Sequence, residues 1–188
     1  MAAWAGCAST SQQRIDTVKA YREARAAGDH AAARAMLGDD PRVWFESREG
    51  PGRPLDPEGK DLYREWDLYF RSKGEDLRWE TAPDSVSVIR SEMNDYFRLI
   101  ERNGSWYRMT YFFDERGRIE GYMVSGCDDA PVTVDRFKEF EAWAIATHPE
   151  EWEYLRPGGR LDPTGDRALR TRGLLNEWRR SIGLAPID

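Results

Sequence analysis

The sequence contains few of the residues from which metal sites and redox centres are built. Its 188 residues include two cysteines, Cys7 and Cys127, and two histidines, His30 and His148. The cysteines form no C-x-x-C pair and the histidines form no cluster, so a zinc site is not indicated and we expect no metal. A disulfide between the two cysteines is an alternative only in an oxidising compartment.

The sequence also lacks the short motifs of several large enzyme classes. It has no G-x-S-x-G, no H-E-x-x-H, no P-loop and no glycine fingerprint for a dinucleotide, and we expect no cofactor. The formal net charge of −6 argues against nucleic acid as a partner, because phosphate binding needs a basic surface. No apolar run reaches the roughly 18 residues that a membrane-spanning helix needs.

The first part of the chain, residues 1–13, is predicted to be flexible. Trp-Ala-Gly-Cys at residues 4–7 precedes a polar stretch and resembles the end of a bacterial lipoprotein signal, in which small residues precede an acylated cysteine. The residues ahead of Cys7 form neither a basic region nor a long apolar region. Two alternatives follow. Either the natural chain starts further upstream and lipidated Cys7 attaches the protein to a membrane of the cell envelope, or the resemblance is chance and the protein is cytoplasmic.

Apolar residues at helical spacing predict three helices in the first part of the chain, at residues 14–27, 29–37 and 59–72. Gly28 should end the first helix and Asp29 should cap the second. The Gly-Asp-Asp-Pro sequence at 38–41 should break the second helix ahead of a short strand at 42–46. Glycine and proline in residues 47–57 predict a loop, which is either a rim over a binding site or a plain surface loop.

Alternating apolar and polar residues predict strands at 77–82 and 85–92, followed by an antiparallel meander over residues 94–126. The meander has three strand-like segments, which are separated by Asn103-Gly104 and by residues 115–117. Asn-Gly between such segments is a strong hairpin signal, because both residues tolerate positive φ. The meander should therefore form the main part of a sheet.

Beyond residue 126 the pattern becomes helical, with predicted helices at 134–147, 149–155 and 166–182. The last of these contains five arginines, whose face is either an anion-binding surface or a solvated one. The order of elements predicts an α+β fold, with a domain at 14–126 and a helical C-terminal extension at 127–188 that packs on it.

Four motifs in the first two thirds of the chain occur in a recognisable order. They are Val18–Asp29 with its Gly-Asp junction, Met36–Asp40, Gly59 at the third helix, and Phe112–Ile119 with the sequence FFDERGRI. Together they resemble the nuclear transport factor 2-like superfamily, which includes SnoaL-like proteins and ketosteroid isomerases. The resemblance implies a cystatin-like cone, in which a curved antiparallel sheet wraps around N-terminal helices. It implies no single activity, because this fold hosts isomerases, dehydratases, hydrolases, cyclases and binding modules.

The resemblance to ketosteroid isomerases implies three catalytic positions: a carboxylate base, a tyrosine and a second acid. Counting from the Gly-Asp junction and from Asp114 places them at Phe45, Tyr21 and Met109, respectively. Phenylalanine and methionine cannot transfer protons, so the set is incomplete. A slip of one residue would bring Glu46 to the position of the base, although without a bulge its side chain would face away from the cavity.

The same counting assigns the side chains of the sheet to two faces. The predicted ligand-binding residues are large and nearly uncharged: Tyr21, Phe45, Trp66, Tyr107, Met109, Tyr111, Phe113 and Tyr122. They form either a pocket for an apolar or aromatic small molecule or a filled core. Residues 106, 108, 110 and 112 should lie on the opposite face, which can form a homodimer or be covered by the C-terminal helices.

Three functions are compatible with the sequence. The first is a SnoaL-like protein that binds a small apolar molecule in the cone, without a recognisable catalytic set. The second is an isomerase- or dehydratase-type enzyme that uses Tyr21 with Glu46. The third is a protein-interaction module, which an exposed apolar patch outside a filled cone would favour.

Overall fold

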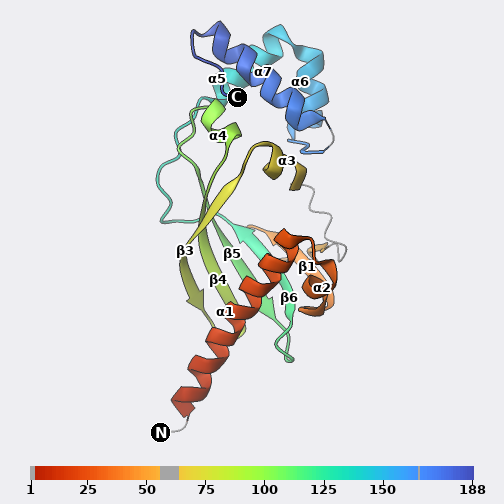
Figure 1. The fold of residues 1–188 in the computed structure, drawn as a ribbon, viewed down its shortest axis with the longest axis vertical. Coiled ribbons are helices and arrows are strands. Elements are labelled where there is room, and N and C mark those ends of the chain that lie inside the picture. The colour runs from red at the N-terminus through yellow and green to blue at the C-terminus, as the bar shows by residue number, and fades with distance from the viewer. Residues whose placement is uncertain (1–2, 56–63, 165) are drawn as a thin grey trace. The chain divides into compact units, whose positions relative to one another are not determined.

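The computed structural model describes residues 3–55, 64–164 and 166–188, and the chain divides into two compact units (Figure 1). Unit 1 contains Met1–Lys60, Glu75–Ser91 and Trp106–Ala130, whereas unit 2 contains Asp61–Gly74, Glu92–Ser105 and Pro131–Asp188. The chain therefore alternates between the units. This division differs from the predicted one, because two segments that the sequence assigned to the domain at 14–126 contribute buried residues to the helical core of unit 2.

Unit 1 is built on a sheet with two N-terminal helices. The helices are α1 (Ala3–Ala27) and α2 (His30–Ala35), and the strands are β1 (Leu37–Phe45), β2 (Arg53–Pro54), β3 (Lys73–Thr81), β4 (Ser85–Met93), β5 (Ser105–Phe113) and β6 (Ile119–Ser125). The six strands lie in the order β2-β1-β6-β5-β4-β3. The predicted α+β class is confirmed.

The elements at the N-terminus, α1, α2 and β1, agree in part with the elements predicted from the sequence. Asp29 caps α2, because its Oδ1 accepts a hydrogen bond from the N–H of Ala32 at 2.9 Å. Helix α1 begins at Ala3 and so covers most of the segment that was predicted to be flexible. Helix α2 ends at Ala35, near its predicted end, but β1 begins at Leu37, so residues 38–41 belong to the strand that was predicted to start at 42. A register shift between Leu37 and Arg42 accommodates these residues within the strand.

The sheet is mixed rather than antiparallel throughout. Strand β5 pairs with β6 in the antiparallel sense, as predicted for the meander. Strand β1 pairs antiparallel with β2, which lies within the segment 47–57 that was predicted to be an unpaired loop, and β1 runs parallel to β6. A parallel pair needs a long crossover, and the described chain between β1 and β6 includes four further strands and two helices.

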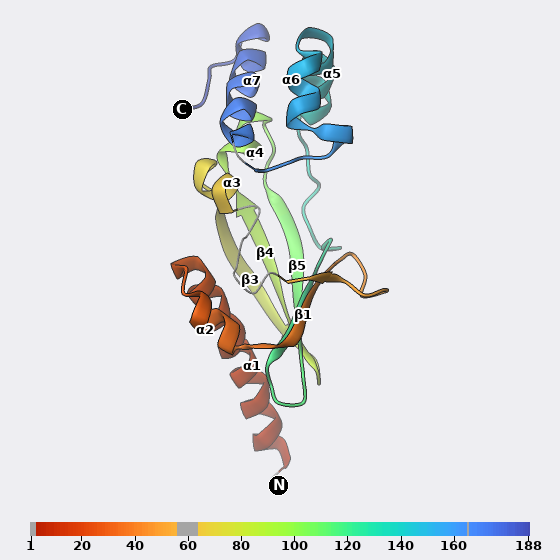
Figure 2. The same ribbon diagram turned by 90° about the vertical axis from the view of Figure 1, so that its right-hand side faces the viewer.

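Helix α1 lies along one face of the sheet, which we call the inner face (Figures 1 and 2). A buried cluster joins the helices to this face; it consists of Val18, Tyr21, Ala33, Leu37, Leu55, Val86, Val88, Tyr111, Phe113 and Ile119. Burial of these apolar side chains holds the helices against the sheet. Because side chains alternate along a strand, the cluster also fixes which residues face outward.

The hairpin between β5 and β6 agrees with the prediction and explains the FFDERGRI motif. Asp114 Oδ1 accepts hydrogen bonds from the N–H groups of Arg116 and Arg118, each at 2.9 Å. Gly117 has a φ of 76°, which glycine adopts without strain. The guanidinium of Arg118 bridges Asp114 and Asp39, also at 2.9 Å. The motif is therefore a turn-forming signal.

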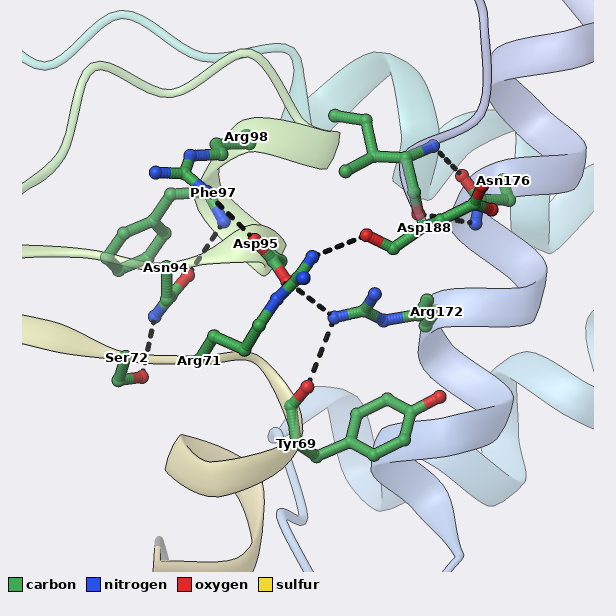
Figure 3. A network of polar contacts seen from close by, with 11 residues as sticks. Tyr69, Arg71, Ser72, Asn94, Asp95, Phe97, Arg98, Arg172, Asn176 and Asp188 are labelled. Atoms are coloured by element: carbon green, nitrogen blue, oxygen red, sulfur yellow. Dashed lines mark hydrogen bonds and ion pairs between the residues drawn. The ribbon is translucent and has the colours of Figure 1, made fainter.

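The first segment of the predicted meander is not a strand but a helix, α4 (Asp95–Leu99). Asn94 caps it, because its Oδ1 accepts a hydrogen bond from the N–H of Phe97 at 2.8 Å (Figure 3). The Asn94 amide also donates to Ser72 Oγ at 3.3 Å. The cap turns the chain into a helix even though the segment alternates like a strand. Strands β4 and β5 are therefore connected through α4.

Replacing Asn94 by alanine is expected to lower the free energy of unfolding by about 1–2 kcal/mol, because the N-cap acceptor is lost. The side chain is only 3% exposed, so water cannot easily take its place. Urea denaturation followed by circular dichroism measures the change. Asn94→Ser keeps an oxygen acceptor for Phe97 and should recover part of the loss. An equal loss in both variants would contradict the capping role.

Unit 2 is helical and has its own core. Its helices are α3 (Arg64–Tyr69), α4, α5 (Phe137–Thr147), α6 (Pro149–Leu155), the short 3-10 helix η1 (Pro157–Gly159) and α7 (Arg167–Ser181). The last three α-helices agree with the predicted ones to within three residues at each end. The predicted start of the third helix at Gly59 lies outside the described residues. Within the described part of the chain, no helix is both long and apolar enough to span a membrane.

A buried carboxylate connects three segments of unit 2 (Figure 3). Asp95 is 0% exposed. Its oxygens lie 2.5 Å from Arg71 Nε, 2.8 Å from Arg172 Nη2 and 3.1 Å from Arg98 Nη1. Arg71 also donates a hydrogen bond to the main-chain oxygen of Asp188. Asp95 thus links the start of α4, the chain after α3, and α7.

Candidate functional site

The register of β1, β6 and β5 places several of the predicted lining residues on the inner face. Met109 pairs with Val124, which in turn pairs with Phe45, and Tyr111 pairs with Tyr122. Residues that pair across neighbouring strands share a face, and Tyr111 belongs to the buried inner cluster. The face assignment that was predicted from the sequence therefore holds for these residues.

One part of the inner face is filled by tyrosine. Tyr21 and Tyr111 are 2% and 1% exposed, and their ring centroids are 6.5 Å apart in an edge-on arrangement. The ring of Tyr122 lies 5.6 Å from that of Tyr111. Burial raises the pKa of Tyr111 far above its usual range, so its hydroxyl stays protonated. This part of the face is a packed core, which Phe113 extends.

The neighbouring part of the inner face is more open. Phe45 lies at the end of β1 and is 55% exposed, with the Arg53 guanidinium 5.6 Å from its ring centroid. Tyr107, Met109 and Tyr122 are partly exposed. Large apolar side chains that share a face and retain exposed surface are typical of ligand-binding surfaces. The open part of the inner face is therefore the candidate site.

Charged side chains stand beside this aromatic row. Asp76 on β3 accepts two hydrogen bonds from Arg22 of α1, at 2.8 and 3.0 Å. Arg90 of β4 lies with its Nε 2.9 Å from Asp76 Oδ1. The side chains of Arg22, Asp76 and Arg90 are 23%, 25% and 18% exposed. We call these three residues the Arg-Asp-Arg cluster.

No sequence motif predicts the Arg-Asp-Arg cluster, although the strand β4 contains one signal for it. Val86 and Val88 alternate on the inner face of β4, and Arg90 continues the same alternation. A charged residue in the next inward position of an apolar face needs a partner or a ligand. Arg22 and Asp76 are 54 positions apart in the sequence, so spacing does not indicate their pairing.

Electrostatics assign Asp76 a structural role. Burial alone would raise the pKa of its carboxyl group, but the hydrogen bonds from Arg22 and the charge of Arg90 lower it below the usual value. A carboxylate with a lowered pKa is a weak general base at neutral pH. Asp76 therefore orients the two guanidinium groups. Among the described residues, no group of His, Cys, Asp and Glu is arranged to hold a metal ion.

Other predicted site residues lie elsewhere. Trp66 belongs to the core cluster of unit 2, not to the cluster that contains Tyr21. Glu46 is exposed at the end of β1, with a φ of 63°, and its carboxylate accepts a hydrogen bond from the N–H of Gly126 at 3.2 Å. The structure thus places Glu46 outside the buried cluster of Tyr21. The side chain of Cys7 lies outside the described residues.

Comparisons with known proteins give matches among solved structures only. No protein-family model and no curated protein matches the sequence. A Mycobacterium tuberculosis protein is 16% identical, covers 58% of this chain and 90% of its own, and has a TM-score of 0.41. SalBIII, an epoxide hydrolase/cyclase-like enzyme of salinomycin pyran ring formation, is 13% identical over 62% of this chain and 92% of its own, with a TM-score of 0.44.

A third matching structure is an NTF2-like protein of unknown function from Cytophaga hutchinsonii. It is 14% identical, covers 59% of this chain and 87% of its own, and has a TM-score of 0.39. Matches at these identities and TM-scores say nothing about activity. In its order of elements and its sequence motifs, the chain resembles the nuclear transport factor 2-like and SnoaL-like superfamily.

Proposed function

We propose that unit 1 is a SnoaL-like domain that binds a small apolar or aromatic molecule on the open part of its inner face. The observation that carries the proposal is the continuous row Phe45–Val124–Met109, which lies beside partly exposed tyrosines on the same face. Phe45 leaves 55% of its surface exposed there. Covering such a surface with an apolar ligand removes it from water, at about 25 cal/mol per Å².

Binding fits the described residues better than catalysis by Tyr21 and Glu46. Tyr21 is 2% exposed, and the Arg25 guanidinium lies 3.5 Å from its hydroxyl. The Glu46 carboxylate instead accepts its hydrogen bond from Gly126, at the end of β6. A general base must reach the proton that it abstracts, so a pair separated in this way does not form a catalytic unit.

Titration with the neutral fluorescent probe phenylnaphthylamine tests the proposal. We expect the wild-type protein to bind the probe saturably, because the probe has two apolar ring systems and no charge. Val124→Trp should weaken binding by at least about tenfold, or about 1.4 kcal/mol, because the larger ring fills the space between Phe45 and Met109. Fluorescence enhancement at increasing probe concentration measures the affinity.

Ser125→Trp is the matched control. Ser125 is the next residue of the same strand and pairs with Arg108, so its side chain lies on the opposite face. This variant should leave the affinity for the probe unchanged, and circular dichroism should show both variants folded. The absence of saturable binding to the wild type, or equal loss in both variants, would refute a site on the inner face.

A further inference from the structure

The Arg-Asp-Arg cluster carries an excess of positive charge next to the proposed site. It combines two guanidinium groups with one carboxylate, and the side chains of all three are at least three-quarters buried. Each guanidinium has five N–H donors. Asp76 uses both its oxygens on Arg22, and one of them also faces Arg90. One carboxylate thus neutralises one of the two charges.

Arg90 is the less well satisfied of the two arginines. Its Nε lies 2.9 Å from Asp76 Oδ1, which is an ion-pair distance. The N–H group is not aligned for a hydrogen bond, and within the described residues this buried Nε has no hydrogen-bond partner. A buried donor without an aligned acceptor is unfavourable. A ligand oxygen that reaches the exposed part of the Arg90 side chain would add an acceptor for this guanidinium.

The aromatic neighbours do not supply the missing charge. Burial lowers the pKa of the Arg22 guanidinium, but its hydrogen bonds to Asp76 raise this pKa above the ordinary value, and Tyr111 and Tyr107 lie nearby. Burial keeps the Tyr111 hydroxyl protonated, so it is a neutral neighbour. Among the described residues, the same inner face of unit 1 therefore presents apolar rings beside two guanidinium groups that share one carboxylate.

We propose that the ligand of unit 1 is amphiphilic: an apolar or aromatic body that carries one negatively charged oxygen group, held by Arg90 with Arg22. This inference rests on the proposed function and adds the chemical class of the ligand. A carboxylate or sulfonate has the paired oxygens that a planar guanidinium binds with two parallel hydrogen bonds. Asp76 keeps both guanidinium groups oriented for this contact.

Two related probes test the proposal. Anilinonaphthalene sulfonate has the ring systems of phenylnaphthylamine plus one sulfonate, so the difference in affinity reports the anionic group. We expect the wild type to bind the sulfonate probe at least about tenfold more tightly, or by about 1.4 kcal/mol. Arg90→Met should abolish this preference and leave the affinity for the neutral probe unchanged. The variant leaves Arg22 paired with Asp76, so the cluster becomes neutral rather than unpaired.

Arg108→Met is the matched control, because Arg108 pairs with Glu80 on the opposite face of the sheet and should not affect the preference. Arg90→Lys keeps the positive charge but not the planar guanidinium group, so this variant should retain part of the preference for the sulfonate probe. If the wild type binds both probes equally, or if Arg90→Met keeps the preference, the anionic ligand is refuted while binding of the neutral probe still supports the proposed function. If the wild type does not bind the neutral probe, both the proposed function and the anionic ligand are refuted.

Discussion

Replacing Asp95 by alanine is expected to lower the free energy of unfolding by about 3–5 kcal/mol, because it leaves a buried charge without its partner. The buried charge left without its partner is that of Arg172. Its side chain is 14% exposed, whereas those of Arg71 and Arg98 are 57% and 55% exposed and can turn toward water. Denaturant titration of the full chain, followed by circular dichroism and tryptophan fluorescence, measures the loss.

Two further variants make this expectation specific. Glu139→Ala removes a carboxylate of the same unit that is 58% exposed and pairs with Arg136, so it should cost far less stability than Asp95→Ala. Combining Asp95→Ala with Arg172→Met removes both buried charges and should recover part of the stability. A loss of less than 1 kcal/mol for Asp95→Ala, or no recovery in the double variant, would show that the pair does not stabilise the fold.

The stability of unit 2 should decrease at acidic pH, as expected for a fold that contains a salt-bridged carboxylate. Burial alone would raise the pKa of Asp95, but hydrogen bonds from Arg71 and Arg172 lower it below the ordinary value of 3.8. The ionised carboxylate therefore stabilises the folded state. Its contribution is complete above the ordinary pKa and is lost as the pH falls through the lower folded value. Asp95→Ala should lack this part of the acid sensitivity.

Replacing Gly121 by alanine is expected to lower the free energy of unfolding by about 3 kcal/mol, at the upper end of the cost of overpacking. A Cβ at this position would clash with the main-chain oxygen of Arg42 and would lie 2.7 Å from Trp44 Cζ3. Arg42 is also its register partner in β1, so the clash separates β1 from β6. Thermal and urea denaturation measure the effect.

Gly173→Ala is the control for this substitution. Gly173 lies within α7, and a Cβ there would meet no atom within 4 Å other than the backbone of its own helix. Alanine favours the helix over glycine by about 0.5–1 kcal/mol, so this variant should be slightly more stable than the wild type. If Gly121→Ala were as stable as Gly173→Ala, the close approach of β1 and β6 would be wrong.

Local signals predicted the elements that local contacts determine. Asp114 and Gly117 form the β5–β6 turn within five residues, and this turn set the register that places Met109 and Tyr111 on the inner face. The C-terminal helices likewise agree with their apolar periodicity. The alternation of residues in α4 is typical of a strand, so it does not predict the helix. The cap that Asn94 provides at the start of the helix outweighs this alternation.

Sequence patterns do not predict contacts between residues that are far apart in the chain. The parallel pairing of β1 with β6 joins residues about eighty positions apart, and no spacing rule indicates it. The same holds for Arg22 and Asp76, which form the candidate site's charged cluster. Trp66 was predicted to line the binding site because it belongs to an apolar face of a helix. Such a face indicates that the residue is buried, but it does not indicate which of the two hydrophobic cores contains it.

The alternation of the chain between the two units has a consequence for protein engineering. Three of the five changes of unit along the chain fall within β3, within β4 and within β5, so at these points continuous strands join the units. Phe70, Leu99 and Ile100 are at most 1% exposed and share their core with Trp178 of α7. Cutting the chain after Gly126 would therefore remove the helices that bury these residues. The C-terminal helices are not a detachable module, and domain exchange by a single crossover would not transfer either unit intact.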